Sequence, residues 1–246
     1  MALLGMLPLL ASCEPDKKPM DHTPATPLPV PENAEIATLG AGCYWCIEAA
    51  LKQIDGVYSV TSGFMGGHAP NPTYDDVCSG ESGYAEVVRV VFDPQKISFG
   101  KLLDWFWKLH DPTTLNRQGN DVGTQYRSVI FCQSDEQKKT AEASKAAAAP
   151  MFDDPIVTEI AAVSEFYPAP VYHQDYYFQN KSKNPYCRFV IEPKLRKLKL
   201  DHCVPQLCLR DESRTTLDQV PDLSVLLKQS KSKTLQARRI SLQHRG

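Results

Sequence analysis

The sequence predicts an α+β protein in which a sheet and a set of helices form two layers. Three observations support this class. Short β-rich segments alternate with segments of helical spacing, and some neighbouring β-rich segments are placed to pair directly. In addition, 42% of the 246 residues are hydrophobic, which is ample for one sizeable core.

The first predicted strand and helix meet at a glycine turn. Residues 35–39 form a short apolar run typical of a buried strand, and residues 47–53 have helical spacing. Gly40 and Gly42 lie between them and permit a tight turn. Cys43 therefore lies where we expect the helix to begin.

The local pattern leaves two interpretations of Cys43 open. At a helix N-terminus, unpaired amides and the helix dipole favour the thiolate and lower the pKa of a cysteine below about 8.5. This predicts an accessible nucleophile, and a second thiol at Cys46 supports it. The other interpretation is a small, buried apolar side chain, which is the commoner place for cysteine.

The middle of the chain continues the alternation. We predict strands over residues 56–64 and 85–92, separated by a glycine-rich loop with one short turn. Ser98 is predicted to cap a helix that ends at His110, because its apolar residues share one face and an Asp-Pro pair follows. A long polar loop then reaches Gly123, and loops of this length in compact domains are commonly functional.

The second half adds two more strands and one helix. Residues 128–132 predict a strand, and residues 134–149 predict a helix capped by Ser134, with acidic residues in its first turn. Residues 157–165 predict a further strand. An aromatic segment over 166–177 follows it.

The ends of the chain differ in composition from residues 35–198, which we predict to be the folded domain. Residues 1–13 resemble a bacterial signal peptide ending in a lipobox at Cys13, although the usual positive charge at the start is missing. Residues 14–34 are proline-rich and predict a semi-rigid spacer. Residues 199–246 show little periodicity and predict a mobile tail. We therefore expect a lipid-anchored protein of the bacterial cell envelope that faces the periplasm, or a cytoplasmic protein if the first segment is not a signal.

Composition excludes several functional classes. A net charge of −2 gives no electrostatic support for nucleic-acid binding. The sequence has no run of about 20 apolar residues, so we expect no transmembrane helix. Eight cysteines with scattered spacing favour a redox or metal role over a disulfide scaffold.

A series of ordered blocks resembles the A type of peptide methionine sulfoxide reductase, which reduces the S epimer. The block at the glycine turn, residues 42–48, is similar to the family's Gly-Cys-Phe-Trp signature. The resemblance covers about residues 35–198. Further matching blocks follow in order: Gly66-Gly67, Asn71-Pro72-Thr73-Tyr74, Val77-Cys78-Ser79-Gly80, Gly83-Tyr84-Ala85-Glu86, Phe106-Trp107, His110-Asp111-Pro112 and the run from Arg117 to Ser128.

This resemblance implies a ferredoxin-like βαβ core with loop extensions and the reduction of methionine S-sulfoxide in proteins. Cys43 would attack the sulfoxide sulfur and become a sulfenic acid. Glu86 matches the family's catalytic glutamate, which donates the proton and needs a pKa raised by burial. Strand position alone instead favours a solvent-facing Glu86.

Other site residues are also implied by the resemblance. Tyr74 and Tyr126 match paired tyrosines that hydrogen-bond the sulfoxide oxygen, and Asp121 matches a loop aspartate. Tyr44, where the family usually has Phe, and Trp45 would line the pocket for the substrate methyl group. Without the resemblance, each of these five is an ordinary loop or core residue.

The residues that reset the enzyme depart from the family pattern. Cys46 stands where the family commonly has Gly, and Cys187 falls where a first resolving cysteine is often found. The usual Gly-rich tail is absent, and Cys203 and Cys208 lie in an atypical one. We expect Cys46 and Cys187 both to take part and thioredoxin to be the reductant. Tyr84 stands in place of a frequent His, a change we expect to be tolerated.

The expected partners are oxidised proteins or peptides as substrates and thioredoxin as reductant, with no bound cofactor or metal and a monomeric state. His110 and His173 are predicted to be structural, because their spacing does not form a zinc pair. Cys78 and Cys132 are predicted to be inert core residues.

Two other functions remain open from the cysteine pattern. A strand, a turn, Cys-x-x-Cys and a helix are also typical of a thioredoxin-like disulfide oxidoreductase. Alternatively, Cys43, Cys46, Cys203 and Cys208 would form a structural zinc site in a lipid-anchored binding module.

Overall fold

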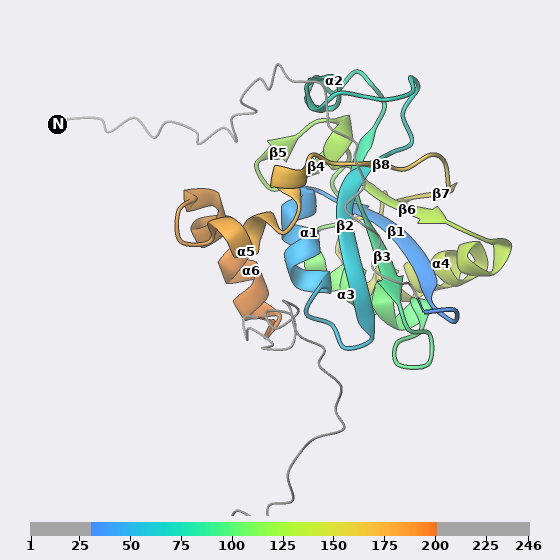
Figure 1. Cartoon of the computed structure of the whole chain (residues 1–246). Helices are drawn as coiled ribbons and strands as arrows, with labels where there is room; N and C mark the ends of the chain where they lie inside the picture. Colours follow the sequence, from blue (N-terminus) through green and yellow to red (C-terminus); the bar gives the residue numbers. More distant parts are fainter. Residues whose placement is uncertain (1–30, 201–246) are drawn as a thin grey trace, which may run out of the picture. The chain divides into compact units, whose positions relative to one another are not determined.

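The computed structural model describes residues 31–200 of the chain (Figure 1). The folded domain begins with a strand at Glu35, as predicted. The predicted signal peptide with Cys13 and most of the proline-rich spacer lie outside the described residues. The same holds for the tail beyond residue 200, with Cys203 and Cys208.

A mixed sheet of six strands forms the centre, in the order β7-β6-β1-β3-β2-β8. Neighbouring strands are antiparallel except β6 and β7, which are parallel. The strands are β1 (Glu35–Ala41), β2 (Val57–Met65), β3 (Ala85–Phe92), β6 (Ser128–Cys132), β7 (Glu159–Ala162) and β8 (Tyr167–Pro168).

Two helices connect strands that are not neighbours in the sheet. Helix α1 (Tyr44–Leu51) lies between β1 and β2, and helix α3 (Phe99–Leu109) lies between β3 and β6. The four strands β6-β1-β3-β2 and these crossovers form the split βαβ arrangement of a ferredoxin-like fold. The fold implied by the resemblance is therefore confirmed. Helix α4 (Asp135–Ala148) then leads from β6 to the parallel strand β7.

The helices share a core with one face of the sheet, which confirms the two-layer prediction. In β3, alternate residues such as Val88 and Val90 join that core, whereas Val87 belongs to a smaller cluster on the opposite face. Phe166 packs against the smaller cluster, with the Arg89 guanidinium 4.4 Å above its ring. The period of two therefore directs even-numbered residues of β3 toward the helices.

The helix starts agree with the sequence, but the long polar loop does not. The side chains of Ser98 and Ser134 accept hydrogen bonds from the backbone three residues further on and cap α3 and α4. The predicted loop instead contains a hairpin of β4 (Arg117–Gln118) and β5 (Asp121–Val122), followed by the 3-10 turn η1 (Thr124–Tyr126). Two-residue strands are too short to show alternation in the sequence.

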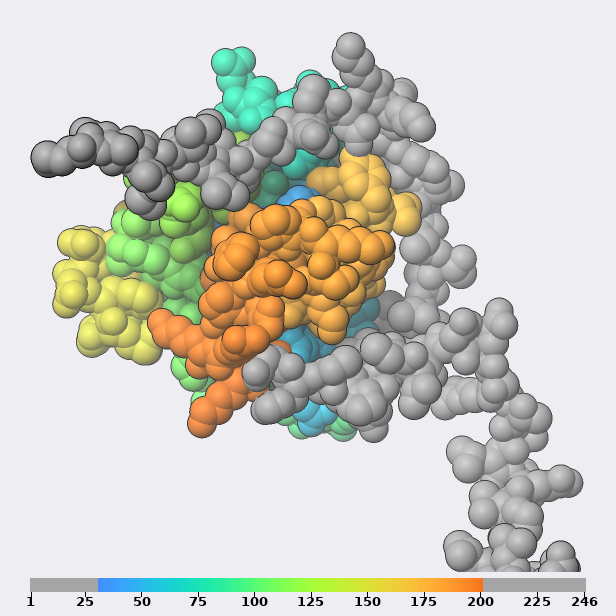
Figure 2. All heavy atoms as spheres, turned by 90° about the vertical axis from the view of Figure 1, so that its left-hand side faces the viewer, coloured from blue at the N-terminus to red at the C-terminus, as the bar shows by residue number. Residues whose placement is uncertain are grey.

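The remaining elements are short. The strand predicted over 157–165 is shorter in the structure, because only the residues of β7, 159–162, pair with β6. The other short elements are α2 (Tyr74–Cys78), η2 (Ala149–Met151), η3 (Val171–His173), α5 (Tyr176–Asn180), the π-helical turn η4 (Cys187–Ile191) and α6 (Glu192–Lys197). Elements α5 and η4 pack against α1, and Figure 2 shows α5, η4 and α6 in orange on one face. Within residues 31–200, no helix is both long and apolar enough to cross a membrane.

Candidate active site

Two buried thiols lie at the N-terminal end of α1. Cys43 is the N-cap residue and is 8% exposed, and Cys46 is 4% exposed. The Cys46 amide donates to the Cys43 carbonyl oxygen at 3.1 Å, and the two thiols share a hydrogen bond. Gly42 before them has φ +83°, and a Cβ there would lie 2.6 Å from the Gln118 side chain. The turn therefore needs glycine both for its backbone angle and for space.

The pKa values of this pair differ from the prediction. Burial raises the pKa of Cys43 well above its usual value, and the hydrogen bond to Cys46 and the charge of Glu86 raise it further. The hydrogen bond from Cys43 lowers the pKa of Cys46 to about 7. Of the two interpretations of Cys43, the structure supports a buried side chain, whose pKa is raised because the thiol is removed from water. Cys46 is the thiol that ionises first.

Glu86 lies beside Cys43 and not in solvent. It is the second residue of β3, on the face that the helices cover, and it is 2% exposed. Its Oε2 accepts a hydrogen bond from the Tyr44 amide at 3.0 Å, which places the carboxyl group at the N-terminus of α1. The solvent-facing interpretation was therefore wrong. The structure brings a buried carboxyl group to the thiol pair.

Aromatic side chains surround the same end of α1. Tyr44 is fully buried, and its hydroxyl shares a 2.5 Å hydrogen bond with His173 Nδ1. The Trp45 ring stacks on Tyr176, with 3.7 Å between ring centroids and a 7° angle. Its indole Nε1 is buried and has no hydrogen-bond partner among the described residues. The ring of Tyr74, half-buried at the start of α2, meets His173 edge-on at 4.6 Å.

Asp121 and Tyr126 approach from the hairpin and the turn after it. Asp121 begins β5 and is half-buried, and burial raises the pKa of its carboxyl group. Its Oδ2 accepts a hydrogen bond from the Tyr186 hydroxyl at 2.9 Å. Tyr126 ends η1, which packs against β3, the strand that holds Glu86. The charge of Asp121 acts on Cys43, which places its carboxyl group near the thiols.

Cys187 is close to Cys46 but not bonded to it. It begins η4, is completely buried and has a free thiol. Burial and the nearby charge of Cys46 raise its pKa to about 11. The segment that holds Cys187 packs against α1, the helix that holds Cys46.

Tyr186 was missed by sequence reasoning. Its hydroxyl bonds to Asp121 and lies 3.8 Å from the Cys46 sulfur. The ring meets Trp45 edge-on at 6.1 Å, and the Tyr186 amide donates to Asn184 Oδ1 at 2.8 Å. The one available signal was its position immediately before the expected resolving cysteine.

The other predicted structural residues lie as follows. His110 is buried, with Nδ1 at 2.8 Å from the Phe106 carbonyl oxygen and Nε2 at 2.7 Å from Ser128 Oγ. Burial lowers its pKa to about 4, so it is neutral near pH 7. Cys132 is buried, but Cys78 is only half-buried at the end of α2, so the prediction of a core residue was wrong for Cys78.

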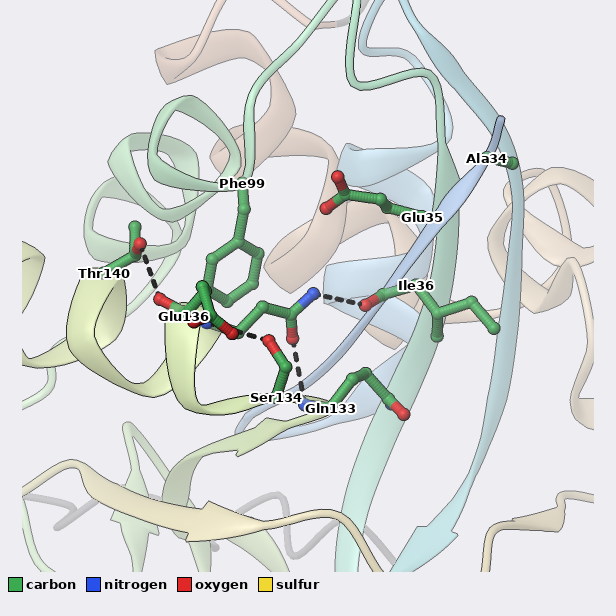
Figure 3. Close-up of a pocket in the computed structure, with 9 residues that line it drawn as sticks. Ala34, Glu35, Ile36, Phe99, Gln133, Ser134, Glu136 and Thr140 are labelled. Carbon is green, nitrogen blue, oxygen red and sulfur yellow. Dashed lines mark hydrogen bonds between the residues drawn. The ribbon is translucent and has the colours of Figure 1, made fainter. Parts of the chain in front are cut away.

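A separate hollow of about 520 Å³ lies between the start of β1 and the first turns of α3 and α4 (Figure 3). Gln137 in it donates to the Ile36 carbonyl oxygen and accepts from the Gln133 amide. None of the predicted site residues lines this hollow. Within residues 31–200, no group of three or more metal-ligating side chains converges on a common point.

The chain is similar over most of this domain to proteins of one family. A family model described as peptide methionine sulfoxide reductase matches residues 35–205. The match therefore continues seven residues beyond the expected end at 198. A protein of Erwinia tasmaniensis named peptide methionine sulfoxide reductase MsrA is 56% identical over 164 residues, which cover 67% of this chain and 92% of that protein. One of the same name from Saccharolobus solfataricus is 52% identical over 163 residues, covering 66% and 92%.

Solved structures agree with these relatives. Methionine sulfoxide reductase A of Corynebacterium diphtheriae superposes with a TM-score of 0.60 and 36% identity, over 63% of this chain and 79% of that one. The reduced form of Mxr1 from Saccharomyces cerevisiae gives a TM-score of 0.60 and 34% identity, over 63% and 90%.

Proposed function

The chain belongs to the peptide methionine sulfoxide reductase family, and from this premise we propose how its own residues perform the reaction. It is a peptide-methionine (S)-S-oxide reductase. One observation carries the assignment of residues: the Cys43 thiol and the Glu86 carboxyl group are held together at the N-terminus of α1 by the hydrogen bond from the Tyr44 amide. A nucleophile and a proton donor are what sulfoxide reduction requires.

In the first step, the Cys43 sulfur attacks the sulfoxide sulfur. Because burial opposes ionisation of Cys43, its proton passes along the existing hydrogen bond to the Cys46 thiolate. The oxygen takes a proton from Glu86 and moves to the Cys43 sulfur. Methionine leaves, and Cys43 remains as a sulfenic acid while Cys46 holds the proton.

The polar and apolar groups around the thiols suit the two parts of the substrate. Tyr74 and Tyr126 are proposed to donate hydrogen bonds to the sulfoxide oxygen, and charge on that oxygen grows as the sulfur is attacked. Tyr44 and Trp45 are proposed to contact the methyl group with their ring faces. Burial of Tyr44 and the stacking of Trp45 on Tyr176 support a fixed wall for this pocket.

The enzyme is reset when the sulfenic acid of Cys43 is converted to a disulfide. The Cys46 sulfur attacks the Cys43 sulfur, and the hydroxyl group leaves as water. The Cys187 sulfur, which lies near Cys46, then attacks the Cys46 sulfur, so that a Cys46–Cys187 disulfide forms and Cys43 leaves as a free thiol. A dithiol reductant, for which we propose thioredoxin, then reduces the Cys46–Cys187 disulfide. The chemistry is carried by sulfur atoms of the chain and requires no bound cofactor.

The separate epimers of a peptide methionine sulfoxide test this function. The purified full-length protein should reduce the S epimer with thioredoxin or with dithiothreitol and leave the R epimer unchanged. Equal turnover of both epimers, or turnover of neither with dithiothreitol, would contradict it. Turnover of free methionine sulfoxide, measured in parallel, shows whether the enzyme also accepts the free amino acid.

The cellular setting is a separate proposal. The Leu10-Ala11-Ser12-Cys13 sequence supports lipid modification of Cys13, an envelope location and a periplasm-facing domain on a proline-rich spacer. Cys13→Ala should move the protein from the membrane fraction to the soluble one without changing activity. We also propose a monomer, which size-exclusion chromatography of the soluble variant would check.

Family membership decides between the proposed function and the two alternatives. The thioredoxin-like interpretation rested on the Cys-x-x-Cys motif, and the strand order instead gives a ferredoxin-like core that matches the reductase family. The zinc interpretation needed Cys203 and Cys208, which lie outside the described residues. Family membership replaces both.

A further inference from the structure

We propose that Tyr186 and Asp121 form a proton relay that serves Cys46 when it captures the sulfenic acid of Cys43. The proposal rests on the proposed function and concerns its second half. Sulfenic acid capture needs a deprotonated Cys46, yet the first step leaves a proton on that sulfur. The site must therefore contain a path for that proton to leave.

The path is a short chain of hydrogen-bonding atoms. The Cys46 sulfur lies 3.8 Å from the Tyr186 hydroxyl, a hydrogen-bonding distance for sulfur, and that hydroxyl donates to Asp121 Oδ2 at 2.9 Å. A hydroxyl both donates and accepts, so it passes a proton on without becoming charged. This matters because burial raises the pKa of Tyr186 far above the range in which it ionises.

Contacts on two sides hold the hydroxyl in place. The Tyr186 ring rests edge-on against Trp45, and its amide is fixed by Asn184. The titratable or charged groups that act on Cys46 come from the residue before α1, from β5, from the start of η4 and the residue before it, and from α6. They are Cys43, Asp121, Tyr186, Cys187 and Lys194.

The carboxyl group at the end of the path is suited to accept a proton and to return it. Burial raises the pKa of Asp121, and its charge lies close enough to Cys43 to raise the pKa of that thiol. The Cys46 proton moves to the Tyr186 oxygen as the Tyr186 proton moves to Asp121. The Cys46 sulfur then bonds to the Cys43 sulfur, the sulfur–oxygen bond breaks, and the departing hydroxide takes the proton from Asp121 and leaves as water. The Cys43 sulfur is reduced as the Cys46 sulfur is oxidised, so this step needs no external oxidant or reductant.

The test separates the two halves of the reaction in rapid-quench experiments with one equivalent of substrate. All proteins carry Cys187→Ser, so that the Cys43–Cys46 disulfide accumulates. Released methionine reports the first half. Alkylation of the remaining thiols, followed by mass spectrometry of the peptide that holds both cysteines, reports the disulfide.

Tyr186→Phe keeps the ring and removes the hydroxyl. We expect disulfide formation to slow by at least about tenfold at pH 6.5, the smaller end of general acid–base effects. Methionine release should slow much less, and only because loss of the Tyr186 hydrogen bond raises the pKa of Cys46. The deficit should shrink toward pH 9, where hydroxide deprotonates Cys46 directly. Tyr58→Phe is the matched control, because it removes a 3.0 Å hydrogen bond to Asp93 away from the thiols.

Asp121→Asn provides a second, independent test if Tyr186→Phe folds poorly. The amide still accepts a hydrogen bond but takes no proton, so the disulfide step should again be slow. A disulfide step as fast as that of Tyr58→Phe, with the same pH dependence, in either variant would overturn the relay. Absence of methionine release from the parent enzyme would instead contradict the proposed function on which the relay rests.

Discussion

Cys43 and Cys46 share one buried environment, and together they resolve a conflict between burial and reactivity. Burial protects a sulfenic acid from other thiols but raises the pKa of the nucleophile. Cys46, whose thiol has a pKa of about 7, removes the conflict, because its thiolate takes the Cys43 proton as Cys43 attacks the sulfoxide.

Cys46→Ser tests this division of roles. Methionine should still appear at one equivalent per enzyme, but the rate at pH 7 should fall by about tenfold or more, the scale of lost general-base help. The half-maximal rate should move to higher pH, because Cys43 must then ionise against its own raised pKa. Stopped-flow or rapid-quench burst rates from pH 6 to 9.5 measure both. Cys132→Ser is the control, and identical pH profiles for the two variants would refute the role of Cys46 as base.

Glu86→Gln tests the proton donor. The amide retains an oxygen to accept from the Tyr44 amide, so the fold should be unchanged, but it has no acidic proton to give. Single-turnover methionine release should slow by about 10²-fold, within the usual range for a general acid. Glu136→Gln, an exposed change on α4, is the control. A rate equal to that of the control would assign the proton to a tyrosine or to water.

At the scale of elements, the strand-turn-helix unit does most to position the site. Glycines of the turn let β1 approach its neighbours closely, and a Cβ at Gly40 would lie 3.0 Å from the Glu86 carbonyl oxygen. The same turn fixes the direction of the first amides of α1, which hold the carboxyl group. A disturbance of the turn should therefore affect the nucleophile and the proton donor together.

Gly42→Ala tests the turn. Positive φ costs an alanine roughly 1–2 kcal/mol, and here the added methyl group also meets the Gln118 side chain. We expect a lower midpoint in urea unfolding and a slower methionine burst. Gly119→Ala is a matched control, because φ is +62° and nothing lies within 4 Å of the added Cβ. If both variants lose the same stability and neither loses burst rate, the close packing at Gly42 is unimportant.

The elements also show what the sequence could predict. Strand β3 was located to the residue, and its alternation already placed Glu86 on the same face as Val88 and Val90. Considered by itself, a charged side chain on a strand predicts exposure to solvent. The hydrogen-bond partner of Glu86 is 42 residues away in the chain, so the neighbouring residues give no sign of it. Tyr186 was missed for the same reason, because its hydrogen-bond partner Asp121 is 65 residues away.

At the scale of the whole molecule, the fold was more predictable than the electrostatics. Helix and strand periods and capping serines located the main elements, and the order β6-β1-β3-β2 agrees with the implied ferredoxin-like core. The sign of the Cys43 pKa shift was not predictable, because it depends on burial of the start of α1, against which α5 and η4 pack. Burial of this kind arises only when distant segments assemble.

The buried His110 predicts a pH dependence of stability. Its pKa is about 4 in the folded protein and about 6.5 in an unfolded chain, so unfolding takes up a proton between these values. Stability from this residue is complete above about pH 6.5 and is lost as the pH falls toward 4. His110→Gln should lower stability at pH 7.5 but flatten the decline of the urea midpoint between pH 7 and 4.5. His68→Gln, an exposed change, should leave the slope as it is; an unchanged slope in His110→Gln would contradict the assignment.

Trapping of the oxidised sulfur tests the central claim most directly. The double variant Cys46→Ser with Cys187→Ser retains the nucleophile and loses both proposed resolving thiols. With one equivalent of the S epimer and a sulfenic-acid reagent such as dimedone, we predict one methionine released per enzyme and one adduct, on the peptide that contains Cys43. Methionine released without any oxidation of Cys43, or an adduct located on Cys78 or Cys132 instead, would contradict Cys43 as the nucleophile.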